Sequence, residues 1–122
     1  MPALAARLRS FAYAFAGVRT LFATQPNFRI HTFAALLVVV GGLALRVTLA
    51  DWLWLTAAIA GVLVTEALNT ALEFLADAVS TDHHPLIGKA KDCAAGAVLL
   101  SALGAAVIGI VVFGPQVLAL RG

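Results

Sequence analysis

The segment "TEALNTALEFLADAVSTDHHPLIGKAKD" (Thr65–Asp92) places charged and polar side chains between two stretches that are almost continuously apolar. It holds every acidic residue of the chain except Asp51. The chain has 122 residues, 62% of them hydrophobic and 11% charged, and its mean hydropathy is +1.01. A soluble domain of this length could not bury so much apolar surface. The sequence therefore predicts an integral membrane protein with a single domain over residues 1–122.

Three apolar stretches are long enough to cross a bilayer, which requires about 20 helical residues. They predict an all-α fold with membrane helices over about 30–50, 52–79 and 89–120. Asp51 is expected to cap the start of the second helix, because a short acidic side chain there accepts hydrogen bonds from free backbone N–H groups. Gly114-Pro115 is expected to end the regular part of the third helix.

Residues 4–23 differ from these spans, because arginines alternate with aliphatic and aromatic residues at helical spacing. This pattern predicts an amphipathic helix that lies on the membrane surface. A frayed N-terminal extension is the alternative. The sequence "TQPN" (Thr24–Asn27) is expected to turn the chain into the first span.

The distribution of basic residues predicts how the chain is oriented in the membrane. Those before the first span or between the second and third spans are Arg7, Arg9, Arg19, Arg29, Lys89 and Lys91. Arg46 and Arg121 fall on the other side. Basic residues are enriched in cytoplasmic loops, so the N-terminus and the polar loop of a multi-pass protein are expected in the cytoplasm. The net charge of +2 gives no indication of a nucleic-acid partner.

The second predicted span carries a polar stripe of four residues: Glu66, Asn69, Glu73 and Asp77. At roughly 100° per residue their directions lie within about 80° of one another, over a length of about 16 Å. An ionisable group within a bilayer costs several kcal/mol, so such groups face a protein interior, a cavity or water. Their alignment on one face predicts a functional site.

Other interpretations of the stripe remain. It could join helices through interhelical hydrogen bonds, although Ser or Asn would serve that purpose. Asp77 alone could lie in the wet interface near the helix end. The acids could also form an ion or proton path. A membrane transporter is disfavoured because the acids lie on one helix, are biased to its cytoplasmic half, and accompany no pair of Gly- or Pro-broken spans.

Acidic side chains of this kind are typical of magnesium-dependent phosphoryl transfer. Mg²⁺ takes one or two carboxylates together with phosphate oxygens, and the attacking hydroxyl needs a base or positioning group. Glu66 is the deepest acid and is placed to meet a lipid hydroxyl, whereas Glu73 lies two turns nearer the cytoplasm and is placed to hold the metal. Lys91 is placed to neutralise phosphate charge, with Asp92 orienting it.

The stretches "EALNTALEFLAD" (Glu66–Asp77) and "DHHPLIGKAKDCAAGAV" (Asp82–Val98) resemble the prokaryotic diacylglycerol kinase family of small membrane lipid kinases. "SFAYAFAGVRTLF" and "NFRIH" match the N-terminal part of the family, so the resemblance covers nearly the whole chain. It implies transfer of the γ-phosphoryl group of Mg-ATP to undecaprenol or diacylglycerol by a homotrimer with composite sites. "TDHHPL" and "AKDCAAGAV" look more like the undecaprenol kinase branch.

The resemblance also implies a role for individual residues. Glu66 would be the base toward the lipid hydroxyl, and Glu73 would bind magnesium and ATP with support from Asn69 and Asp77. The positions implied to contact the nucleotide are Tyr13, Asp82, His83, His84, Lys91 and Asp92. For His83 and His84, a solvated loop position is the alternative.

Gln25 departs from the family pattern. Two residues before N-F-R-I-H the family has a glutamate that shares the metal with the position of Glu73. The amide of Gln25 still offers an oxygen to Mg²⁺ but carries no charge. This departure predicts weaker metal binding or a lower catalytic rate. In that case the protein would be a catalytically weakened member of the family.

Overall fold

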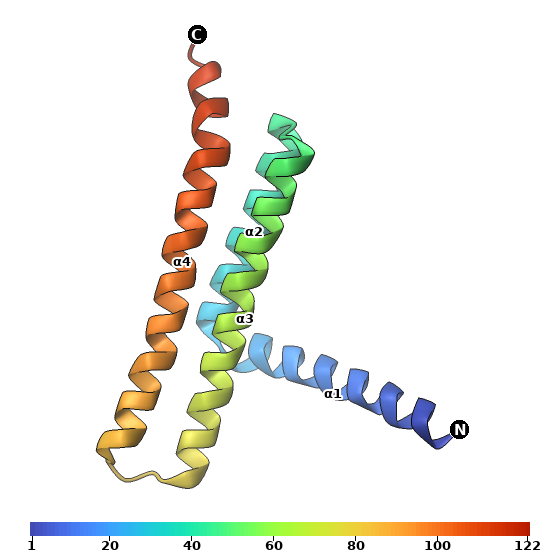
Figure 1. Ribbon diagram of the computed structural model, residues 1–122, viewed down its shortest axis with the longest axis vertical. Helices are drawn as coiled ribbons and strands as arrows, with labels where there is room; N and C mark the ends of the chain where they lie inside the picture. Colours follow the sequence, from blue (N-terminus) through green and yellow to red (C-terminus); the bar gives the residue numbers. More distant parts are fainter.

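The computed structural model describes all 122 residues and contains four helices. These are α1 (Pro2–Thr24), α2 (Pro26–Leu45), α3 (Leu49–Val79) and α4 (Pro85–Ala119). Helices α2, α3 and α4 run side by side, and α1 projects sideways from them (Figure 1). Each of these three helices, α2, α3 and α4, is long and apolar enough to cross a membrane. The predicted all-α, multi-pass architecture is confirmed.

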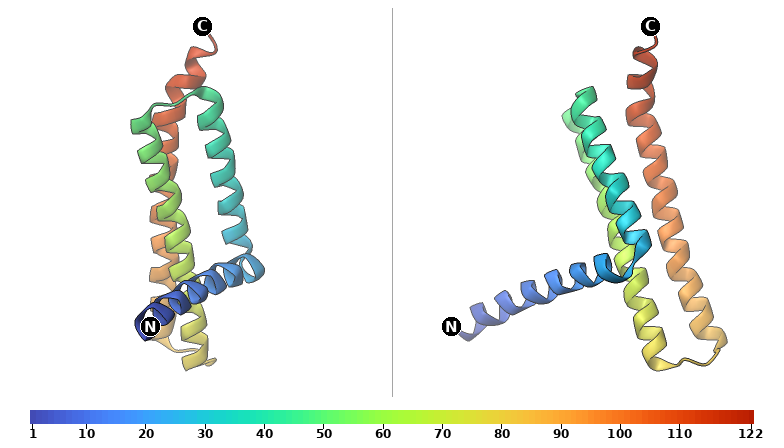
Figure 2. Two further views of the ribbon diagram at one scale, coloured as in Figure 1. Left: turned by 90° about the vertical axis from the view of Figure 1, so that its right-hand side faces the viewer. Right: turned by 180° about the vertical axis from the view of Figure 1, so that it is seen from behind.

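The junction between α1 and α2 turns the chain at Gln25, whose backbone is extended with φ −114° and ψ 101°. Pro26 then opens α2, a position where its missing N–H has no helical partner to lose. The only buried residue of α1 is Leu21, and next to it the rings of Phe22 and Phe28 pack edge to face at 4.9 Å. The right-hand view in Figure 2 shows α1 projecting away from the other helices toward the N-terminus. Its placement on the membrane surface stays a prediction.

The turn between α2 and α3 corrects two predictions. Helix α2 ends at Leu45, earlier than expected, because Arg46 takes a left-handed conformation with φ 53° and ψ 50°. The N-cap of α3 is Thr48, not Asp51: Thr48 Oγ1 accepts from the Asp51 N–H, and the Asp51 carboxylate accepts from the Thr48 N–H, both at 3.1 Å. This reciprocal capping box requires the acidic residue three positions after the cap.

The end of α4 corrects a third prediction. The helix continues through Pro115 to Ala119 instead of ending at Gly114-Pro115. A proline removes one backbone hydrogen bond and strains the preceding turn, but a single further turn can follow it. Tighter bonds complete that turn, since the N–H groups of Leu120 and Arg121 donate to the carbonyls of Val117 and Leu118.

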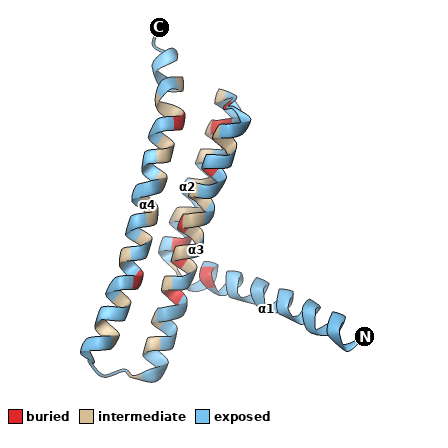
Figure 3. Ribbon diagram, viewed as in Figure 1, coloured by how far each residue is buried: buried red, intermediate tan, exposed pale blue.

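The packed core lies at the end of the bundle that is distant from the polar loop. Val47, Leu55 and Val112 form its buried cluster. Gly42 lets the Trp52 ring pack against the α2 backbone, since a Cβ at Gly42 would lie 2.6 Å from a ring carbon. Only 10 of the 122 residues are buried, and Figure 3 shows most of each helix exposed. The exposed aliphatic and aromatic side chains are therefore left for lipid or for other subunits to cover.

Helices α3 and α4 are longer than a bilayer requires. Their 31 and 35 residues correspond to about 46 and 52 Å, against a hydrocarbon core of about 30 Å. Figures 1 and 2 show α3 and α4 extending past the α1–α2 junction at the end that carries the α3–α4 loop, and α4 also extending beyond α2 and α3 at its C-terminal end. The polar segment thus occupies the part of the hairpin that projects from the bundle.

Candidate active site

The four stripe residues of α3 differ in burial along the helix. The Glu66 side chain is 4% exposed, and the side chain of Asp77 is 60% exposed. Asn69 and Glu73, between them, are half-buried. The stripe therefore runs from the packed interior, near the start of α2, to the solvent-exposed end of the hairpin.

At the inner end, Glu66 faces His31 of α2. The distance from His31 Nε2 to Glu66 Oε2 is 3.8 Å, which is longer than a hydrogen bond. Glu66 Oε2 and the nearby Asn69 Oδ1 are both buried without a hydrogen-bond partner. Leaving such an atom unpaired costs about 1–3 kcal/mol, and native proteins rarely do so without a reason. The two oxygens indicate a place where another group binds.

His31 is not among the site residues that the sequence predicts. It belongs to the "NFRIH" motif, and its position within that motif is the signal that could have identified it. The polar stripe of α3 can be read from the spacing within one helix. The pairing of His31 with Glu66 depends on how α2 packs against α3, which no spacing within either helix reveals.

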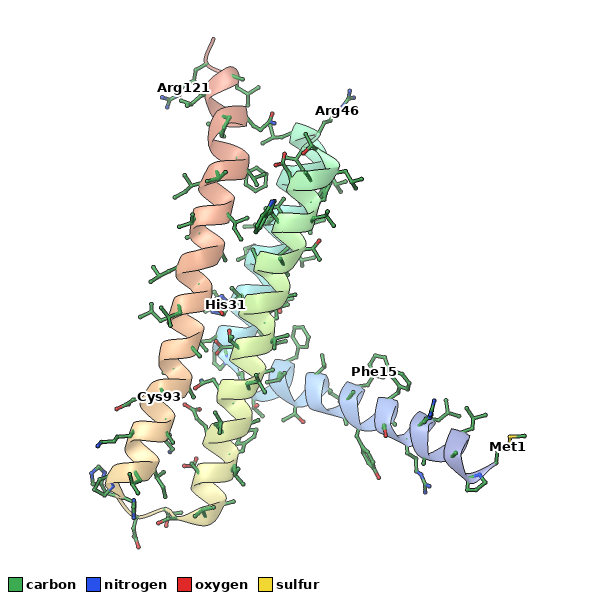
Figure 4. All side chains as sticks on the ribbon, viewed as in Figure 1. Met1, Phe15, His31, Arg46, Cys93 and Arg121 are labelled. Carbon is green, nitrogen blue, oxygen red and sulfur yellow. The ribbon has the colours of Figure 1, made fainter.

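An apolar cavity of about 160 Å³ lies beside His31, between α2, α3 and α4. Figure 4 shows the His31 side chain in this region, between α4 and the α2–α3 pair. Apart from His31, the lining consists of glycine and apolar side chains: Ala34, Ala35, Val38, Leu55, Ala58, Ile59, Val62, Leu63, Ala102, Ala105 and Gly109. His31 is thus the polar end of a cavity that is otherwise suited to hydrocarbon.

At the outer end, α3 and α4 are joined by an ion pair. Lys91 Nζ donates to Asp77 Oδ1 at 2.6 Å. Beside this pair lies a second, polar cavity of about 250 Å³ at the α3–α4 loop. Its lining residues are Asp77, Ser80, Thr81, Asp82, His83, His84, Ile87, Gly88 and Lys91. The structure therefore brings five of the predicted site residues together around one polar cavity.

His84 also has a structural role in this loop. Its Nδ1 accepts a hydrogen bond of 3.1 Å from the Leu86 N–H and so caps α4. The Asp82 N–H donates to Ser80 Oγ at 3.2 Å, which shapes the preceding turn. Because Nδ1 of His84 is occupied, only its Nε2 is left for a ligand.

Other predicted residues lie outside the two cavities. Tyr13 is 73% exposed on the projecting part of α1, and Asp92 is exposed on α4. Gln25 lies at the α1–α2 junction, where its Nε2 donates to Thr24 Oγ1 at 3.1 Å. Glu73 lies on the stripe between the cavities, one turn from Asn69 and one from Asp77.

The predicted metal ligands do not form a preassembled cage. No three His, Cys, Asp or Glu side chains are close enough to hold a metal ion together. The donor chemistry nevertheless fits Mg²⁺, which binds hard oxygens and usually takes one or two protein ligands with substrate phosphates and water. The carboxylate of Glu73 and the amide oxygen of Gln25 are ligands of that kind.

The fold and the site define a small helical membrane protein with an acidic stripe between an apolar and a polar cavity. The sequence model of the prokaryotic diacylglycerol kinase family matches residues 12–113. The chain therefore belongs to this family, which is a class of membrane lipid kinase.

Several curated relatives carry kinase names. A diacylglycerol kinase of Synechocystis is 47% identical over 116 residues, which are 93% of this chain and 65% of that protein. The undecaprenol kinase of Bacillus subtilis is 36% identical over 108 residues, which are 88% of each chain. The diacylglycerol kinase of Escherichia coli K12 is 30% identical over 100 residues, which are 82% of each. This chain thus spans about two thirds of the Synechocystis protein and most of the other two.

Proposed function

We propose that this protein transfers the γ-phosphoryl group of Mg-ATP to the hydroxyl of a lipid alcohol at the cytoplasmic face of the bacterial inner membrane. The observation that supports the proposal most strongly is the position of Glu66. It is a buried acid with an unpaired oxygen, and it contacts the residue that forms the polar end of an apolar cavity. A carboxylate in this position can accept a proton from an alcohol whose hydrocarbon part is out of water.

Glu66 would act as the general base. Phosphoryl transfer depends mainly on positioning and charge neutralisation, and a base or positioning residue orients the attacking hydroxyl. The stripe places Glu66 about 10 Å along the helix axis from Glu73, at 1.5 Å per residue. A lipid hydroxyl at Glu66 and nucleotide phosphates near Glu73 would then approach each other along one face of α3.

The nucleotide would bind at the solvent end of the stripe. Lys91 is the cation at the polar cavity, and its pairing with Asp77 holds the ammonium group there. Glu73 and Gln25 would hold Mg²⁺, with Asn69 supporting the same face. When bound, the ion neutralises phosphate charge. Nucleotide contacts are assigned by the family resemblance to Tyr13, Asp82, His83, His84 and Asp92.

The assembly is proposed to be a homotrimer with sites between subunits. Residues 94–97 of α4 are Ala, Ala, Gly and Ala, a run of small residues that permits close approach of helices. Of these residues only Ala94 is buried, and a Cβ at Gly96 would meet no atom within 4 Å. The surface of α4 around Gly96 is therefore free to pack against a second copy.

The orientation is proposed from the arginines and lysines. Arg46 and Arg121 lie together at the end of the bundle opposite the α3–α4 loop (Figure 4). The remaining basic residues lie on α1, at the start of α2 and at the start of α4. A cytoplasmic N-terminus places the nucleotide cavity in the cytoplasm, where ATP and Mg²⁺ are available.

The acceptor is proposed to be undecaprenol in preference to diacylglycerol. Relatives named for each acceptor match the chain, so the preference rests on the "TDHHPL" and "AKDCAAGAV" sequences. The test is transfer from labelled ATP by the purified protein in mixed micelles, with the two lipids in parallel. We expect magnesium-dependent labelling of both lipids and a higher kcat/KM for undecaprenol. Labelling of neither lipid, or ion flux in liposomes without ATP turnover, would refute the proposed function.

A further inference from the structure

The His31 and Glu66 side chains approach each other without pairing directly. The 3.8 Å from His31 Nε2 to Glu66 Oε2 is too long for a direct hydrogen bond. An oxygen atom placed beside the pair, off the line that joins the two atoms, can lie at about 2.8–3.0 Å from both and so bridge them. Such an oxygen would receive an N–H from His31 and satisfy the buried Glu66 Oε2, which lacks a partner.

The surroundings restrict what can carry that oxygen. The Glu66 side chain is 4% exposed and the His31 side chain is 28% exposed, so the carboxylate is withdrawn from water while the imidazole is partly accessible. His31 lines the apolar cavity of about 160 Å³ that extends between α2, α3 and α4 toward Gly109. A molecule that fills both places has an apolar body and one terminal hydroxyl.

The other charged groups of the site lie away from His31 and Glu66. The other ion pair, between Lys91 and Asp77, lies at the solvent end of the stripe, 11 residues further along α3. Arg29, the nearest other basic residue on α2, is exposed. His31 is therefore the ionisable neighbour that can act on Glu66 and on a group bound beside it.

We propose that His31 and Glu66 bind the acceptor hydroxyl together, with the His31 N–H donating to its oxygen and the Glu66 carboxylate accepting its proton. This inference rests on the proposed lipid kinase function and adds a catalytic residue to it. The hydroxyl oxygen forms a bond to the γ-phosphorus while the bond from that phosphorus to the bridging oxygen of ADP breaks. The electron pair of the broken bond leaves with ADP, and the hydroxyl proton passes to Glu66. His31 keeps the attacking oxygen within reach of Glu66 throughout.

The test compares three variants of the 122-residue chain in mixed micelles with undecaprenol or diacylglycerol. His31→Leu removes the donor and keeps an apolar side chain at the cavity. His31→Gln keeps an uncharged N–H donor at about the same reach. Thr32→Val is the matched control, because the Thr32 hydroxyl bonds only its own helix, at the Phe28 carbonyl.

We expect His31→Leu to lower kcat/KM for the lipid alcohol about 100-fold, the loss typical of a misplaced reactant. The KM for Mg-ATP should stay unchanged, because the nucleotide cavity lies at the other end of the stripe. His31→Gln should recover activity to within about tenfold of the wild type, because the Gln N–H can still donate to the lipid hydroxyl. A change in the strength of one neutral hydrogen bond, which is worth about 1 kcal/mol, is then the main difference. Thr32→Val should match the wild type.

Three outcomes would overturn the inference and can be told apart. If the wild type phosphorylates lipid and His31→Leu matches it in kcat and in the KM for lipid, His31 has no role in binding the acceptor and the kinase assignment stands. If the KM for Mg-ATP rises in parallel with the loss of lipid turnover and Gln does not rescue it, the role of His31 is structural. A wild-type protein that phosphorylates no lipid alcohol would overturn the proposed function together with the inference.

Discussion

Lys91 of α4 and Asp77 of α3 form an ion pair of 2.6 Å at the rim of the polar cavity. The pair joins the two longest helices of the chain near the α3–α4 loop that connects them. Both side chains are partly exposed, at 38% and 60%, and exposed ion pairs contribute little to stability, about 1 kcal/mol or less. The position of the pair therefore matters more for ligand binding than for folding.

Exchanging the two charges separates these roles. In Asp77→Lys/Lys91→Asp the pair can still form, but the cation moves from α4 to α3. We expect the KM for Mg-ATP to rise about tenfold or more, because a phosphate contact to a cation is a charge-assisted hydrogen bond of about 1.5–3 kcal/mol. Resistance to unfolding in a denaturant titration should change little. Wild-type KM in the exchanged variant would show that the pair serves only to join the helices.

Gln25 provides a gain-of-function prediction. Gln25→Glu adds a carboxylate at the proposed metal site, and a second acidic ligand strengthens binding of a hard cation. We expect the magnesium concentration that gives half-maximal activity to fall about tenfold, which corresponds to about 1.4 kcal/mol. Gln25→Ala is the matched control, since it removes the oxygen altogether and should shift the titration the other way. If both variants titrate like the wild type, Gln25 does not contact the metal.

The contact between Gly42 and Trp52 tests the packing of the bundle independently of catalysis. Gly42→Ala would place a methyl group 2.6 Å from the Trp52 ring, so the ring or the helix must move. Overpacking of this kind costs about 1–3 kcal/mol, which should appear as earlier unfolding in a detergent-denaturant titration. Gly61→Ala on α3 meets no atom within 4 Å and should be neutral or slightly stabilising. Equal behaviour of the two variants would contradict the packing described for α2 and α3.

Much of the fold can be predicted because the bilayer imposes strong requirements on the sequence. Apolar stretches of spanning length identify α2, α3 and α4, and the proline at position 26 marks the start of α2 once the turn is known. The ends of helices are less predictable. Whether Thr48 or Asp51 caps α3 depends on one or two hydrogen bonds, and Pro115 does not end α4, since one further turn follows it.

The candidate site is predictable where it lies on a single helix. Glu66, Asn69, Glu73 and Asp77 share a face by their spacing alone, and their burial then follows from the position of α3 in the bundle. Contacts between residues on different helices cannot be predicted from the spacing of residues within one helix. The sequence places His31 in a motif but does not reveal that it faces Glu66, and it does not show that Lys91 pairs with Asp77.

The Glu66→Gln variant examines whether Glu66 accepts the proton of a lipid hydroxyl. The amide keeps the shape of the side chain but cannot take the proton, and general-base catalysis contributes about 10²- to 10⁴-fold to rate. The measurement is kcat for lipid phosphorylation together with the KM for Mg-ATP, in a variant that inserts and assembles normally. We expect kcat to fall within that range at an unchanged KM for Mg-ATP. A Gln variant that keeps the wild-type kcat would show that Glu66 is not the base.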